Sequence, residues 1–166
     1  MEERIRTNER MRAMLAREEI RSRLDCTPLD PKLQALINSG LVEIKGCWFL
    51  RRLIRRGFDF DGDLGQFTDH TDLEWSENGI HPDLVAHKHM DPDDLFLQGY
   101  AYAMQLARLL EGKGSFRIYL SFDVTDGLYS CKAGFFRVRS DEPPMLDDPE
   151  ASKLNALLTL DTSERM

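Results

Sequence analysis

The sequence has few cysteines and no long hydrophobic run. Cys26, Cys47 and Cys131 are an odd number of cysteines at unrelated spacings, without a CxxC pair. This favours free or buried thiols in a reducing cytoplasm over a disulfide framework. No apolar stretch approaches the roughly eighteen residues that a transmembrane helix needs. The N-terminus lacks the apolar core of a signal peptide, and Glu2 and Glu3 argue against a transit peptide. We therefore expect a cytoplasmic protein that does not enter the membrane.

Catalytic signatures are also missing from the chain. It contains no GxSxG, P-loop, GxGxxG or HExxH motif. The stretch 59–63 begins like a calcium loop, but Leu64 and His70 stand where such a loop needs glycine and glutamate. We therefore expect no catalytic residue and no cofactor, with a divalent transition metal as the alternative.

The composition and the charge distribution favour one globular domain with an acidic centre. The 166 residues are 42% hydrophobic and 31% charged, which is enough for a core without disulfides and excludes collagen-like and disordered chains. The net charge of −7 arises mainly between residues 59 and 112, which hold 12 Asp/Glu and 2 Lys/Arg. Such a block attracts a basic partner and repels phosphate backbones. The alternative is a solvated loop that keeps the protein soluble.

The first third of the chain predicts helices around one short strand. Residues 1–24 are rich in Glu and Arg and predict a helical arm, whose ragged apolar stripe makes a homodimer conceivable. A capped helix over 31–39 and an alternating strand over 41–45 follow. Residues 47–56 place four apolar side chains on one helical face and four arginines on the other, which predicts another helix.

The rest of the chain predicts an α+β fold with a small antiparallel sheet. Residues 58–90 have no sustained period and predict a long acidic loop. Residues 92–111 carry the strongest helical pattern, and alternation over 115–139 predicts a β-hairpin that packs on this helix. Residues 154–160 fit either a last strand or the end of a short helix.

The central acidic region is the predicted partner-binding surface. Carboxylates complement a basic partner and speed its association, and aromatic residues among them supply interface anchors. Phe58 and Phe67 are better explained as core residues under the loop. The predicted partner-binding residues are Asp59, Asp61, Asp63, Asp69, Asp72, Glu74 and Trp75.

Two alternatives rest on other residue types. All four histidines, His70, His81, His87 and His89, lie close together in the sequence among aspartates, and imidazole with carboxylate suits a transition metal. This arrangement predicts a metal-dependent enzyme as the first alternative function. The arginines of 51–56 predict a nucleic-acid-associated regulator as the second, although the acidic block that follows argues against it.

The last part of the chain suggests a family. The stretch from Ser130 to Asp161 combines Ser130-Cys131, Val138-Arg139, an acidic loop and a closing apolar segment that ends at Asp161. This stretch resembles the C-terminal portion of small acidic immunity proteins of bacterial polymorphic toxin systems. The resemblance implies an α+β protein without catalytic residues that binds and neutralises a basic toxin domain. It also favours a strand over 154–160.

Overall fold

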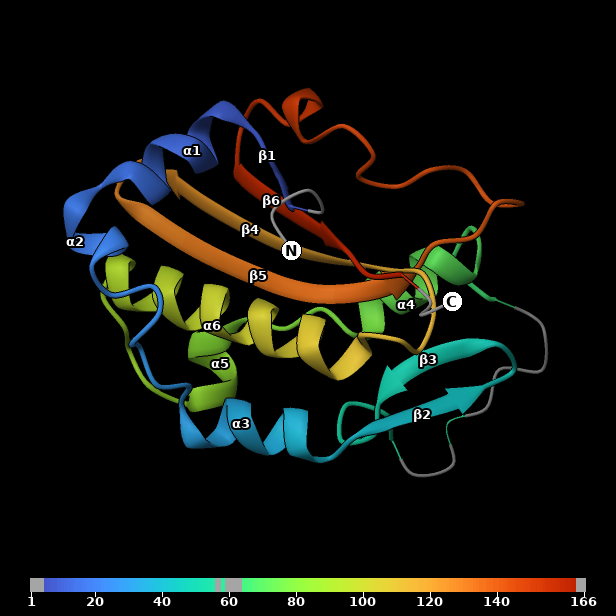
Figure 1. The fold of residues 1–166 in the computed structure, drawn as a ribbon. Helices are drawn as coiled ribbons and strands as arrows, with labels where there is room; N and C mark the ends of the chain where they lie inside the picture. Colours follow the sequence, from blue (N-terminus) through green and yellow to red (C-terminus); the bar gives the residue numbers. More distant parts are fainter. Residues whose placement is uncertain (1–4, 56–57, 59–63, 164–166) are drawn as a thin grey trace.

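A four-stranded antiparallel sheet with one long helix along one face forms the centre of the molecule (Figure 1). The computed structural model of the chain describes residues 5–55, 58 and 64–163. The strand order is β1-β6-β4-β5, and a separate hairpin pairs β2 with β3. This confirms the predicted α+β fold. None of the helices in the described part of the chain has the length and apolarity that a membrane span requires.

The central helix and the long hairpin lie where the sequence predicts them. Helix α6 (Pro92–Leu110) begins at Asp91, whose side chain accepts a hydrogen bond from the backbone of Asp94. Strands β4 (Phe116–Thr125) and β5 (Leu128–Arg137) meet at a two-residue turn in which Asp126 and Gly127 both have positive φ. Their alternating apolar side chains pack against α6, so the two best-patterned segments of the sequence build the core together.

The N-terminal segment is helical as predicted, but its helix is divided in two and a short strand precedes it. Strand β1 (Ile5–Thr7) pairs with β6, and helices α1 (Glu9–Ala16) and α2 (Glu18–Arg21) follow it. The break is at Asn8, which caps α1 through its side-chain oxygen and donates from its amide to the backbone of Ser152 and Asn155. Because Met11 and Ile20 are fully buried, this segment is part of the core.

A long connection crosses the face of the sheet opposite α6. Strand β6 (Ala156–Asp161) settles the ambiguity of 154–160 in favour of a strand. Both β5 and β6 pair antiparallel with β4, so they run parallel to each other, and residues 138–155, here called the crossover loop, join them. Arg117 projects from β4 away from α6, donates to the Met145 carbonyl and pairs with Asp147. The loop therefore covers the second face of the sheet, and it contains the short 3-10 helix η2 (Pro149–Ala151).

The segment around the small hairpin confirms two predictions and corrects a third. Helix α3 (Pro31–Asn38) and strand β2 (Leu41–Ile44) are confirmed, but β3 (Cys47–Leu50) takes the place of the helix predicted over 47–56. The turn at Lys45-Gly46, with positive φ at both residues, returns the chain as a strand whose Cys47, Phe49 and Leu50 are fully buried. Strand rather than helix results because apolar contacts are available on both faces.

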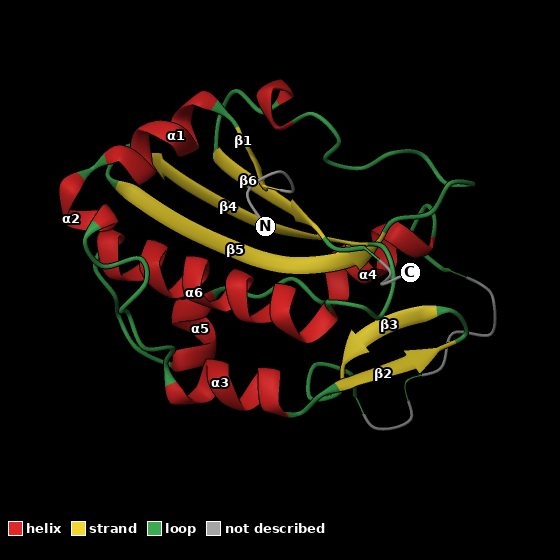
Figure 2. Cartoon of the chain, in the orientation of Figure 1, coloured by secondary structure: helices red, strands yellow, loops and turns green. Residues whose placement is uncertain are grey.

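The acidic region 58–90 is more regular than expected. It contains helices α4 (His70–Glu77) and α5 (Pro82–Ala86), each of only one or two turns, which is too short for a clear period in the sequence (Figure 2). Phe58 and Phe67 pack with Phe49 and Leu73 beneath this region, as predicted for core residues.

Gly99 sets the distance between α6 and the sheet. A methyl group added there would lie 2.4 Å from Sγ of Cys131 and 2.8 Å from Cδ1 of Leu120. We expect Gly99→Ala to lower the free energy of unfolding by about 1–3 kcal/mol, because overpacking outweighs the gain in helix propensity. Urea unfolding measures this change. Adding Cys131→Ala to Gly99→Ala should restore part of the loss, and a Gly99→Ala variant as stable as the parent would contradict this account.

Candidate functional site

Helix α4 brings together most of the predicted partner-binding residues. Asp69 caps the helix by accepting from the backbone N–H of Asp72 (2.8 Å), and Asp72 in turn accepts from the backbone N–H of Thr68 (3.1 Å). Glu74 and Trp75 lie within the helix. The predicted residues Asp59, Asp61 and Asp63 precede it and lie outside the described residues.

Glu74 is a buried residue of the interior, whereas the sequence predicted it on the partner-binding surface. Its side chain is fully buried and receives both guanidinium nitrogens of Arg139 at 2.9 Å. The same carboxylate accepts the backbone N–H of Trp48 (2.6 Å) on β3 and that of Arg137 (2.7 Å) on β5. A buried carboxylate with four donors is fully compensated, so it has no capacity left for a partner.

Asn78 continues this bridge one helical turn later. Its Oδ1 accepts from the backbone N–H of Leu50 (3.1 Å), and its Nδ2 donates to the carbonyls of Trp48 (2.8 Å) and Phe135 (3.3 Å). Asn78 and Glu74 thus form hydrogen bonds with backbone groups of both β3 and β5, as a strand lying between them would. Neither Asn78 nor the pairing of Arg139 with Glu74 was predicted from the sequence, and the only signal for Asn78 is its place four residues after Glu74 on one helix.

Trp75 is fixed against the sheet. Nζ of Lys132 lies 3.6 Å from the centroid of its ring, and the ring of Tyr119 lies beside it at 6.1 Å. Tyr119 also donates its hydroxyl hydrogen to the Trp75 carbonyl (3.0 Å). Burial lowers the pKa of Lys132. Trp75 therefore anchors α4 and leaves only part of its indole exposed.

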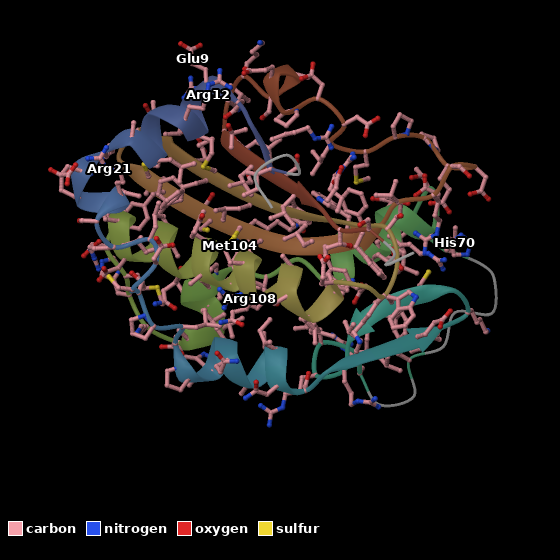
Figure 3. The ribbon with its side chains drawn as sticks, viewed as in Figure 1. Glu9, Arg12, Arg21, His70, Met104 and Arg108 are labelled. Atoms are coloured by element: carbon pink, nitrogen blue, oxygen red, sulfur yellow. The ribbon has the colours of Figure 1, made fainter. Side chains whose placement is uncertain are left out.

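The acidic residues fall into two groups that the sequence does not distinguish. In the first turn of α6, Asp93 is neutralised by Arg17, between α1 and α2, and Asp94 by Arg23, just after α2. Among the described residues, no cation pairs with Asp69 or Asp72. Figure 3 shows the reason, because His70 on α4 lies at the opposite end of the molecule from Arg12 and Arg21 on the basic helices.

Beside α4, the crossover loop contributes a second carboxylate, which is largely buried. Glu142 accepts from the backbone N–H of Thr71 (2.9 Å) and from its hydroxyl (2.5 Å), and Nδ1 of His70 lies 3.1 Å from it. Burial raises the pKa of Glu142, but the Thr71 hydrogen bonds and the positive charge of Arg139 outweigh it, so that the pKa is lowered overall. Glu142 thus ties the loop to the N-terminus of α4.

The four histidines do not form a common site in the described part of the chain. His70 contacts Glu142, whereas His81 and His87 flank α5, and the ring of His89 lies 6.3 Å from that of Tyr129. Over the described ranges, no three His, Cys, Asp or Glu side chains are placed to hold a metal ion. The predicted basic helix is also absent, since Arg51 and Arg52 lie in a turn after β3.

Comparison with known proteins gives one match. The family model described as Uncharacterized protein PM0498 family covers residues 6–165. No curated protein matches the chain. No solved structure matches it either.

Removing the buried carboxylate tests the bridge. We expect Glu74→Ala to lower the free energy of unfolding by about 3–5 kcal/mol, because it leaves the Arg139 guanidinium buried without its partner. The matched control is Glu77→Ala on the same helix, where a half-exposed side chain should change stability by less than about 0.5 kcal/mol. Chemical unfolding of both variants measures the difference. Equal losses of stability in the two variants would show that the Glu74–Arg139 pair does not hold the fold together.

Glu142 predicts a pH dependence of stability. A carboxylate whose pKa is lower in the folded protein stabilises it above the ordinary value of 4.5, and this contribution is lost as the pH falls through the folded pKa. We expect Glu142→Gln to destabilise the protein at neutral pH and to become equivalent to the parent in acid. Unfolding curves over a pH series measure the difference. A stability gap that does not depend on pH would contradict the assignment.

Proposed function

The chain belongs to the Uncharacterized protein PM0498 family, and we propose that it is a non-enzymatic protein-binding module that holds a basic partner on α4. The class of partner that the C-terminal resemblance implies is a toxin domain, which the protein would neutralise. The observation that carries the proposal is the pair of carboxylates at the start of α4, whose charge no described cation neutralises.

The two carboxylates are held ready for a partner. Asp69 uses Oδ1 and Asp72 uses Oδ2 to cap the helix, and among the described residues the second oxygen of each has no hydrogen-bond partner. Because capping already fixes both aspartate side chains, the entropy lost when a Lys or Arg of a partner binds is that of the partner's side chain alone. Their negative field also speeds the association of a basic protein.

Two of the three cysteines, Cys47 and Cys131, are buried in the core and are not candidates for a nucleophile. Burial raises the pKa of Cys47 to about 12, and it raises the pKa of Cys131 further. A thiol is nucleophilic as the thiolate, so these cysteines act as small apolar core residues.

The decisive experiment removes the charge and keeps the cap. In Asp69→Asn/Asp72→Asn each side chain keeps an oxygen that accepts the capping bond, because Asn caps about as well as Asp. The matched control is Asp91→Asn/Asp148→Asn, which changes two other capping aspartates and alters the net charge equally. Purified cationic toxin domains, with nuclease domains first, are titrated calorimetrically at about 50 mM and about 300 mM salt.

We expect the parent chain to bind a toxin domain, with affinity that falls as salt rises. The α4 double variant should bind about tenfold more weakly or worse, and the control should stay within about twofold of the parent. The proposal fails if no toxin domain binds the parent, or if both double variants lose the same affinity.

A further inference from the structure

The small hairpin leaves one strand edge open. The N–H group of Arg51 donates to the Gly40 carbonyl (2.9 Å). Every second residue of β2, starting from this pair, therefore directs its N–H and C=O groups toward β3. Leu41 and Glu43, which are the residues between, direct their N–H and C=O groups away from the hairpin. The opposite strand confirms this register, because Trp48 and Leu50 turn their N–H groups outward to α4.

Outward backbone groups of the neighbouring strands β3 and β5 have hydrogen-bond partners, whereas most of those of β2 have none among the described residues. Glu74 and Asn78 cap the outer edge of β3, and Ile80 pairs with Ala133 on β5. In the described part of the chain, both backbone groups of Glu43 and the N–H of Leu41 have no partner. The Leu41 carbonyl accepts only the exposed guanidinium of Arg51 (3.2 Å). Uncovered edges of this kind invite pairing with another strand.

An apolar cleft of about 410 Å³ lies beside this edge. It is lined by Gly40, Leu41, Trp48, Leu109 and Lys113. The Trp48 ring is held edge-on against Phe116 with 5.9 Å between the centroids, which makes this wall of the cleft rigid. Leu41 and Trp48 project from the same face of the hairpin, so a strand added to β2 would direct every second side chain toward the cleft.

The two cations at this cleft and edge outnumber the one carboxylate of β2, Glu43, which projects from the same face as Trp48. Lys113 lines it, and no described acidic side chain pairs with this cation. Arg51 supplies a second positive charge at the end of the edge. We propose that the β2 edge binds an extended, acidic peptide segment of another protein by strand addition. The backbone of the segment pairs with Leu41 and Glu43, one large apolar side chain fills the cleft, and a neighbouring carboxylate meets Lys113.

This surface differs from the α4 face in charge and in mode. It selects an acidic strand, whereas the carboxylates of α4 select a basic surface. The inference therefore stands without the proposed function. The test also differs, because loss of binding at one surface leaves the other intact.

The probe is an acetylated, amidated peptide, Thr-Asp-Thr-Leu-Thr-Asp-Thr, which places its leucine and aspartates on one face of a strand. NMR titration with amide hydrogen exchange follows binding to the full chain. We expect exchange at the Leu41 and Glu43 amides to slow by about tenfold or more at saturation, while Val42, already paired with Phe49, changes little.

Two variants separate the edge from the cleft. Glu43→Pro removes an outward N–H without touching a hairpin hydrogen bond and should abolish peptide binding. Lys113→Glu preserves the strand and should weaken binding about tenfold, whereas Lys153→Glu on the crossover loop should not. A parent chain that does not bind the peptide, or that binds it without slower exchange at Glu43, overturns the proposal. A Glu43 amide already protected in the free protein, together with a dimer in sedimentation, would instead assign the edge to a second copy.

Discussion

The buried ion pair between Glu74 and Arg139 is the interaction on which the arrangement of this fold depends. Removing a carboxylate and a guanidinium from water costs several kcal/mol each, and only near-complete compensation makes the pair tolerable. Here the carboxylate also accepts backbone N–H groups from β3 and β5, while Arg139 reaches the Gly46 carbonyl in the hairpin turn. A shift of the hairpin, of α4 or of β5 would leave one of these charges unpaired. The pair therefore fixes the positions of the hairpin, α4 and β5 relative to one another, although the hairpin and β5 are not paired in one sheet.

This constraint reaches the surface through α4. Glu74 and Trp75 hold the helix from within, and Glu142 holds its first turn from the crossover loop. A helix of two turns would not be stable alone in water, so its position depends on these side chains. Because the inward-facing residues fix the helix, the capping carboxylates of Asp69 and Asp72 keep their places at its start. The same helix thus carries both the structural charges and the charges that we assign to partner binding.

Sequence patterns predicted the segments in which the apolar period repeats many times and which pack against segments close to them in the chain. Helix α6 and the β4–β5 hairpin have many turns or alternations, and one matching face of each builds the core. The pattern over 47–56 failed because β3 is buried on both faces, which removes the alternation that identifies a strand. The helical character of the N-terminal segment was predicted, but strand β1 and the break at Asn8 were not, because the contacts of Asn8 are with residues about 150 positions away, which no local pattern contains. For the candidate site, composition located the acidic region but did not separate buried Glu74 from half-buried Asp72, since burial is a property of the tertiary contacts.

Strand edges in the described part of this protein are of two kinds: some have hydrogen-bond partners within the chain, and the edge of β2 is open to another protein. The edge of β5 is closed by backbone from Ile80 and by side chains from α4, and β3 is closed by the same helix. The groups that close these edges are themselves buried and need hydrogen-bond partners, so each bond satisfies both sides. The β2 edge lies on the outside of the hairpin (Figure 1). Among the described residues, none forms a hydrogen bond with the backbone of Glu43. Most folds protect such an edge with charge, a bulge or proline. Here Glu43 is the only charged residue within β2, and the cleft beside it is apolar with a cation on its rim. An edge with unpaired amides next to an apolar cleft is suited to a strand from another chain, and this is the physical basis for assigning β2 to recognition.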